Sequence, residues 1–204
     1  MTDPPLERWL AALVSTPGLT SVREPGEARR VHVEDALAAL PLLGEGPVVD
    51  VGSGGGSPGL PLAAARPDLE FDLVESSARK CAFLRTWAAE LPNVEVVQAR
   101  AEAHGRAAGR DAYGTVVARA LALPPVAVEW CLPLVASGGR FVLFAGETDE
   151  DAAAHAAEQV AGRLVETIPV EGSERRVLLL FEKTGLTPER FPRRPGAARK
   201  RPLA

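Results

Sequence analysis

The chain alternates between short apolar runs and longer segments whose apolar residues recur at steps of three and four. Short apolar runs predict strands, and the second spacing predicts helices that bury one face. The predicted strands are 48–52, 70–75, 94–98, 114–118, 140–145, 164–170 and 175–181. The predicted helices open at Pro58 and cover 77–91, 124–131 and 149–162, with a short turn or helix at 101–109. This order is typical of a Rossmann-like α/β fold with a mostly parallel seven-stranded sheet.

Both ends of the chain depart from this alternation. A first helix is predicted around 6–13 and a second from 26 to 40, while the polar link at 171–174 predicts a hairpin with an antiparallel strand. Three prolines after residue 190 predict an extended tail. We therefore expect an N-terminal helical cap at 1–45, a main domain at 46–183 and a basic extended tail at 184–204 that packs on or near it.

Composition excludes several classes of protein. The 204 residues are 46% apolar and 25% charged, which suits one soluble α/β domain and not a disordered chain. The first ten residues lack a long apolar run, so we expect a cytoplasmic protein without a signal peptide or membrane span. Cys81 and Cys131 are expected to be buried free thiols, and the scattered histidines predict no metal site.

Charge is distributed unevenly. The net charge is −4, but residues 183–204 carry seven basic residues against Glu189, which makes this segment +6 and leaves −10 for the rest. A basic end on an acidic body is typical of proteins that contact polyanions. A solvated tail that binds nothing explains the same charges equally well.

The glycine-rich stretch from Val48 to Gly59 carries the strongest chemical signal. A buried strand leads into Asp50, then into a glycine cluster and a helix, which is how a nucleotide-like cofactor is held against backbone. Its G-x-G-x-x-G pattern also fits a dinucleotide. Asp50 would repel a pyrophosphate but attract the ammonium and sulfonium of S-adenosylmethionine. Glu75, at the end of the next strand, suits ribose hydroxyls or, alternatively, caps the helix near Ser77.

Several further stretches follow one another in a distinctive order. They are Leu19 to Arg23 with His32 and Asp35 to Leu37, Val49 to Gly54, Pro58 to Ala63, Leu73 to Ser76 with Lys80, Phe83 and Leu84, Ala99 to Glu102, Ala118 to Ala120, Gly172 to Arg176, and Phe191 to Gly196 with Lys200 to Leu203. Together these stretches resemble the RsmG (GidB) family of bacterial 16S ribosomal RNA guanine-N7 methyltransferases. The resemblance extends over roughly residues 19–203 and is far more specific than the glycine motif alone.

The resemblance implies a cofactor, an acceptor and residues that hold them. S-adenosyl-L-methionine would lie on the glycine loop, Ala101 with Glu102 would flank the adenine, and Arg119 would lie beside the cofactor and the incoming base as the catalytic residue. As alternatives, Glu102 is a helix-start acid and Arg119 a surface ion pair. The cofactor-binding residues implied are Asp50, Gly52, Ser53, Gly54, Ser57, Glu75, Ser76, Ala101, Glu102 and Arg119.

The same resemblance implies 16S rRNA or the small ribosomal subunit as partner, bound by a monomer. The RNA-binding residues expected are Arg23, Arg175, Arg193, Arg194 and Lys200. We expect them, with Arg29, Arg30, Arg119 and Arg176, to form one basic face around the cofactor mouth.

Guanine N7 carries a lone pair and no proton, so its methylation needs positioning and electrostatics and no general base. This agrees with a sequence in which we find no catalytic triad or paired carboxylates. Because Ala145 stands where the family often has lysine, another RNA or a small molecule is an alternative acceptor. A non-catalytic cofactor-binding module and a nicotinamide enzyme are further alternatives.

Overall fold

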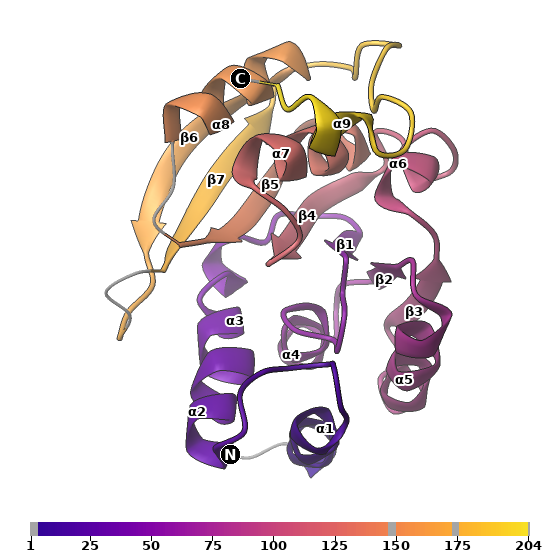
Figure 1. Ribbon diagram of the computed structural model, residues 1–204, viewed down its shortest axis with the longest axis vertical. Helices are drawn as coiled ribbons and strands as arrows, with labels where there is room; N and C mark the ends of the chain where they lie inside the picture. Colours follow the sequence, from indigo (N-terminus) through magenta and orange to yellow (C-terminus); the bar gives the residue numbers. More distant parts are fainter. Residues whose placement is uncertain (1–3, 147–149, 173–175, 204) are drawn as a thin grey trace.

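A twisted seven-stranded sheet forms the centre of the protein, seen in the computed structural model, which describes residues 4–146, 150–172 and 176–203 (Figure 1). The strand order is β3-β2-β1-β4-β5-β7-β6, and β7 runs antiparallel to both of its neighbours. The predicted fold class is confirmed. The strands are β1 Val48–Val51, β2 Phe71–Glu75, β3 Val94–Gln98, β4 Tyr113–Arg119, β5 Val135–Ala145, β6 Gly162–Pro169 and β7 Val177–Lys183.

Helices cover both faces of the sheet. Helices α1 to α5 lie on one face and α6 to α9 on the other (Figure 1). The bounds are α1 Pro4–Ser15, α2 Pro25–Arg29, α3 Asp35–Leu37, α4 Gly59–Ala65, α5 Ala78–Ala88, α6 Ala101–His104, α7 Pro124–Cys131, α8 Glu150–Gln159 and α9 Ala197–Lys200. Further helical turns in the described residues are the π-helical η1 Arg30–Glu34 and the 3-10 turns η2 Leu40–Leu42 and η3 Leu132–Leu134.

Alternate residues of the central strands supply the cores on the two faces. Val49 and Val116 point into the core under α7 and α8, whereas Val48 and Val117 pack with α4. Because both faces are covered, β1 is buried along its whole length, which explains why its residues other than Asp50 are valines. Cys81 and Cys131 are buried free thiols, as predicted.

Three local predictions need correction. The helix expected at 26–40 is divided into α2, a π-helical turn η1, α3 and the 3-10 turn η2. Strand β5 begins at Val135 and not at residue 140, because a register shift opposite β4 lets the strand continue through a glycine pair that typically ends a strand. The tail is not extended throughout, since α9 forms one helical turn in the proline-free stretch after Gly196.

Some predicted boundaries fall outside the described residues, namely 149, 173, 174 and 175. The parallel strands β1, β2 and β4 and their neighbour β5 end at the same edge of the sheet. In open α/β sheets ligands bind in the crevice outside this edge. The fold therefore places the glycine loop, Glu75, Arg119 and Ala145 around one crevice.

Candidate active site

The glycine loop after β1 adopts backbone conformations that favour glycine. Gly52 has a φ of +74° and Gly54 a φ of +58°. A Cβ atom added at Gly52 would lie 2.5 Å from Leu121 Cδ1. The loop therefore presents bare backbone to the crevice, as close approach to a ligand requires.

Asp50 lies beneath this loop. Its Oδ2 accepts a hydrogen bond from the Gly59 amide at 3.0 Å, and the Ser53 hydroxyl donates to its carbonyl oxygen at 2.8 Å. The side chain is buried, and this burial raises its pKa to about 7. Among the described residues, Asp50 does not line the cavities at the sheet edge. Its observed contacts therefore position the loop.

Glu75 connects the loop to the next helix. Its Oε2 accepts from the Gly54 amide at 3.1 Å and its Oε1 from the Ser77 amide at 2.7 Å. The Ser76 hydroxyl donates to Oε1 at 3.3 Å. Glu75 thus accepts a hydrogen bond from the amide just before α5, as expected if it caps that helix. It also lines a cavity at the sheet edge.

That cavity, which we call the β2 cavity, has a volume of about 360 Å³ and lies between the ends of β1, β2 and β3. It brings together five of the predicted cofactor-binding residues, Gly52, Glu75, Ser76, Ala101 and Glu102.

The C-terminal tail forms part of its wall. Glu102 is buried, and its Oε1 accepts a hydrogen bond from the Gly196 amide at 3.2 Å. The Arg199 guanidinium lies 5.1 Å from the ring centroid of Trp130, and both residues line the cavity. The helix-start acid interpretation of Glu102 agrees with its place in the first turn of α6, but its observed role is to hold the tail.

A second cavity of about 230 Å³, the loop cavity, lies on the other side of the glycine loop. Ser53, Gly54 and Ser57 line it together with Arg119 and Lys80. Because Lys80 lines both the loop cavity and the β2 cavity, the two adjoin.

Arg119 and His32 shape the loop cavity. Arg119 Nη1 donates to the Val31 carbonyl at 2.5 Å and to Ser57 Oγ at 3.3 Å, while Ser57 Oγ donates to the His32 carbonyl at 2.8 Å. Burial lowers the pKa of Arg119, although the charge of Asp50 opposes this shift. Burial, together with Arg119 and Arg176, lowers the pKa of His32 to about 4, so His32 is neutral at pH 7.

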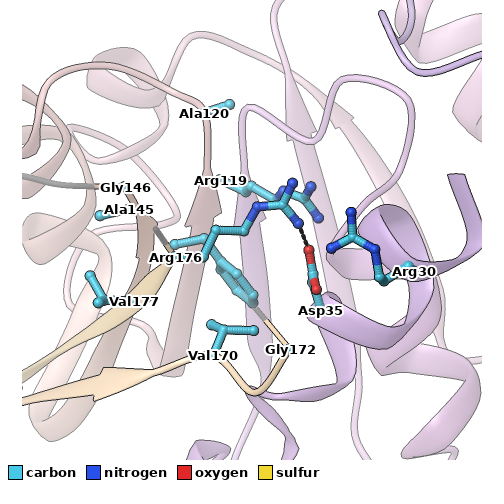
Figure 2. A pocket seen from close by; sticks show the side chains of 11 residues that line it. Arg30, Asp35, Arg119, Ala120, Ala145, Gly146, Val170, Gly172, Arg176 and Val177 are labelled. Carbon is cyan, nitrogen blue, oxygen red and sulfur yellow. Dashed lines mark ion pairs between the residues drawn. The ribbon is translucent and has the colours of Figure 1, made fainter. Parts of the chain in front are cut away.

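The third cavity, of about 640 Å³, opens beside Arg119 and is called the acceptor cavity here. Figure 2 shows the guanidinium groups of Arg30, Arg119 and Arg176 near one another around Asp35. Asp35 and Arg176 form an ion pair. With three guanidinium groups around one carboxylate, this cavity is positively charged and suits an anionic polymer. Phe144 also lines it.

The predicted basic face is formed only in part. Arg30, Arg119 and Arg176 meet at the acceptor cavity. Arg29 pairs instead with Glu7, and Arg23 donates to the Val14 carbonyl at 2.6 Å.

The predicted RNA-binding residues of the tail have different surroundings. Arg193 is paired with the buried carboxylate of Glu129, whereas Arg194 and Lys200 are exposed. Arg175 lies outside the described residues. Lys183, which contributed to the predicted basic tail, is buried and donates to Asp111 Oδ1 at 2.7 Å, so its charge is unavailable to a polyanion.

Lys80, Asp35, Phe144 and Arg199 line the cavities but were not among the predicted site residues. Lys80 stands five positions after Glu75, on the helix that begins at the site, and this position is a usable signal. Asp35 precedes the first strand, and its place in the crevice depends on how α3 packs, which the local sequence does not reveal.

Within residues 4–146, 150–172 and 176–203, no group of three or more His, Cys, Asp or Glu side chains is arranged to hold a metal ion. The helices in these ranges include none that is long and apolar enough to cross a membrane.

The strand order with the antiparallel β7, the glycine loop between β1 and α4, and an acid at the end of β2 are those of the class I methyltransferase fold. The chain belongs to the GidB family, described as rRNA small subunit methyltransferase G, whose family model matches residues 6–179. This confirms the resemblance seen in the sequence.

Curated relatives match most of the chain. The ribosomal RNA small subunit methyltransferase G of Rubrobacter xylanophilus is 43% identical over 197 residues, covering 89% of this chain and 75% of that protein. The protein of the same name from Pelotomaculum thermopropionicum is 40% identical, covering 91% of this chain and 82% of its own.

Solved structures agree with the fold. A geranyl diphosphate methyltransferase, in complex with GPP and sinefungin, has a TM-score of 0.62 and 15% identity, covering 85% of each chain. The antibiotic-resistance methyltransferase Kmr has a TM-score of 0.56 and 19% identity, covering 74% of this chain and 92% of its own. At these identities the likeness concerns the fold alone.

Proposed function

We propose that the protein transfers a methyl group from S-adenosyl-L-methionine to N7 of a guanine in the 16S rRNA of the small ribosomal subunit. The observation that carries this proposal is that Arg119 and Ala120 line both the loop cavity and the acceptor cavity. A cofactor held on the glycine loop would thus adjoin a cavity suited to RNA. Membership of the rRNA methyltransferase family supports the substrate.

The chain's residues fit this cofactor. The β2 cavity would take the adenosine, with Glu75 accepting hydrogen bonds from ribose hydroxyls and Ala101 with Glu102 beside the adenine. The loop cavity would take the methionine portion, with Gly52 to Gly54 supplying backbone and Lys80 a positive charge for the carboxylate. When bound, the cofactor supplies an electrophilic methyl group on a sulfonium.

The chain then needs to align the acceptor and exclude competing reactions. Guanine N7 attacks with its own lone pair, so no side chain has to remove a proton before transfer. Orientation alone can contribute about 7–11 kcal/mol to such a reaction. In this proposal Arg119, which donates to the Val31 carbonyl and to Ser57 Oγ, contacts both the cofactor and the base.

RNA would be held by phosphate contacts around this crevice. Arg30 at the acceptor cavity and the exposed Arg194 and Lys200 of the tail are the proposed contacts. Arg23 stays a proposed contact at the N-terminal side, and Arg193 acts through its pair with Glu129 to position the tail. In this proposal the chain works as a cytoplasmic monomer, with residues 1–45 as a cap, 46–183 as the methyltransferase domain and 184–204 as the tail.

The test is methyl transfer from radiolabelled S-adenosylmethionine to 16S rRNA and to small subunits that lack the modification. We expect incorporation at one guanine, mapped by chemical cleavage at 7-methylguanine. Calorimetry should show binding of S-adenosylmethionine and not of NAD. Incorporation into neither substrate would contradict the acceptor, and binding of NAD alone would contradict the cofactor.

Replacing Arg119 tests the catalytic assignment. Arg119→Ala should lower single-turnover methyl transfer by about 100-fold, the typical loss of one electrostatic contact to a transition state. Arg119→Lys keeps the charge but loses the planar fork, so it should recover only part of the rate. Arg106→Ala, an exposed arginine beyond α6, is the matched control. Wild-type turnover in Arg119→Ala, with an unchanged melting temperature, would remove Arg119 from the site.

A further inference from the structure

The ion pair between Asp35 and Arg176 has an unusual place, inside the acceptor cavity. Asp35 comes from α3, and its side chain is only 4% exposed. Arg176 precedes β7, and its carbonyl accepts a hydrogen bond from the Val170 amide at 2.9 Å, which fixes it to the β6–β7 hairpin. Figure 2 shows the pair next to Arg30 and Arg119. Two elements far apart in sequence thus hold a carboxylate and a guanidinium side by side.

A cavity that served only phosphate would not favour this carboxylate. A buried negative charge repels an anion at short range and weakens the field of the three arginines. A carboxylate accepts hydrogen bonds and donates none, whereas a guanidinium only donates. Asp35 Oδ2 and Arg176 Nη1 are buried against each other. The second carboxylate oxygen and the other guanidinium N–H groups remain for a flat ligand that carries donors next to an acceptor.

We propose that Asp35 and Arg176 recognise the Watson–Crick edge of the acceptor guanine. The Asp35 carboxylate accepts from N1–H and from the exocyclic amino group at C2, and Arg176 donates to O6. Adenine presents the opposite order, with a donor at C6 and an acceptor at N1. Enzymes that act on an extruded base commonly read this edge and stack the ring on an aromatic side chain, a role that Phe144 fills here. This inference rests on the proposed guanine-N7 methyl transfer.

The proposed contacts also orient the reaction. In guanine, N7 lies beside O6 on the Hoogsteen edge, across the purine from the C2 amino group. Fixing that edge at Asp35 therefore turns N7 away from α3 and towards Arg119, which borders both this cavity and the glycine loop. Asp35 and Arg176 would determine specificity and geometry together.

The test compares guanine with inosine, which keeps N7, O6 and N1–H but lacks the C2 amino group. RNA carrying inosine at the mapped methylation site is prepared by ligation, and single-turnover rates are measured for both RNAs. The wild-type protein should prefer guanine by about 5- to 150-fold, the usual discrimination of a paired base contact. Equal rates for the wild-type protein would overturn the proposal whatever any variant does.

Two variants separate the roles. Asp35→Asn replaces an acceptor with an amide donor, so it should slow transfer to guanine and reduce the guanine-to-inosine ratio to near one. Arg176→Gln acts on O6, which both bases carry, so it should slow both reactions and leave the ratio unchanged. Glu34→Gln is the control, because Glu34 adjoins Asp35 in sequence but has a 59% exposed side chain whose carboxylate lies near Arg29.

Three further outcomes have distinct meanings. An unchanged ratio in folded Asp35→Asn would overturn the assignment of Asp35 while leaving the proposed function intact. If Asp35→Asn does not fold, the proposed recognition of guanine is supported when Arg176→Gln prefers guanine to inosine by the same factor as the wild-type protein. No transfer by the wild-type protein to any guanine of the rRNA or the subunit would overturn the proposed function, and this inference with it.

Discussion

At the scale of single residues, Asp50 shows how a binding loop can be built at the expense of stability. Its carboxylate is buried without a described partner for Oδ1, and only the Gly59 amide bonds to Oδ2. Burial raises its pKa to about 7, whereas an unfolded aspartate has a pKa of about 4. Between these two pH values the folded protein therefore binds a proton that the unfolded chain releases.

This linkage predicts a pH dependence. Because the pKa of Asp50 is higher in the folded protein, its protonation contributes to the unfolding free energy. This contribution is complete below about pH 4 and is lost as the pH rises to about 7. The total loss is at most about 4 kcal/mol. Asp50→Asn should remove this loss, so its unfolding free energy should fall less between pH 5 and pH 8 than that of the wild-type protein. Urea unfolding at both pH values measures it.

The control is Asp151→Asn, an exposed aspartate in α8. Its unfolding free energy should depend on pH in the same way as that of the wild-type protein. If Asp50→Asn lost as much stability as the wild-type protein over this range, the raised pKa of Asp50 would be contradicted.

Asp50 and Glu75 also show what sequence could and could not reveal. Asp50 lies one residue before the end of β1 and Glu75 ends β2, and the parallel sheet brings these strand ends together. Sequence spacing did not predict that Asp50 is covered by Gly59 while Glu75 lines a cavity. That difference depends on how the loop folds back, and a strand-end position does not determine it.

At the scale of elements, the C-terminal tail is held by a buried ion pair. Glu129 in α7 is fully buried and accepts hydrogen bonds from the Arg193 backbone amide at 3.2 Å and from its Nε at 2.7 Å. Arg193 also donates to the Arg201 carbonyl at 2.7 Å. Arg110 adds a bond to the Phe191 carbonyl at 2.7 Å. These contacts dock the tail against α7 and α6, beside the β2 cavity.

Glu129→Gln should therefore loosen the tail. It removes the charge under Arg193 and should lower the unfolding free energy by about 1–3 kcal/mol. Because Gly196 and Arg199 line the β2 cavity, the affinity for S-adenosylmethionine should fall as well. Calorimetry measures that affinity, and trypsin should cleave the loosened tail faster.

Glu182→Gln is the matched control, because it breaks an exposed ion pair with Arg163 and such pairs contribute little. If Glu129→Gln and Glu182→Gln had the same affinity for S-adenosylmethionine and the same rate of tail cleavage, the tail would not be held through Glu129.

Elements formed by local pattern were predicted well, and elements formed by distant contacts were not. All seven strands were predicted because each is a short run rich in apolar residues, bounded by helices or turns and, between β6 and β7, by a polar link. The docked tail was predicted to be extended because its prolines are visible in sequence, whereas Glu129 lies 64 residues from Arg193. The division of the segment at 26–40 likewise depends on its packing against α4 and the hairpin.

At the scale of the whole molecule, an acidic protein of net charge −4 places several of its 23 basic residues around adjoining cavities at one edge of the sheet. Arg30, Arg119 and Arg176 meet at the acceptor cavity, and Arg199 and Lys80 border the adjoining β2 cavity. Acidic side chains elsewhere would repel RNA. We therefore expect a polyanion to be steered to the crevice where the glycine loop lies.

This distribution predicts how RNA affinity depends on salt. Each phosphate contact on single-stranded RNA contributes about −0.7 to the slope of log affinity against log salt. Arg194 and Lys200 are exposed on the tail beside the β2 cavity. The double change Arg194→Ala with Lys200→Ala should make the slope shallower by about 1.4, measured by fluorescence anisotropy on a 16S rRNA fragment between about 50 and 200 mM salt. Arg163→Ala, in β6 and paired with Glu182, should leave the slope unchanged. A slope equal to that of the wild-type protein in the double variant would place the RNA away from the tail and confine its contacts to the acceptor cavity.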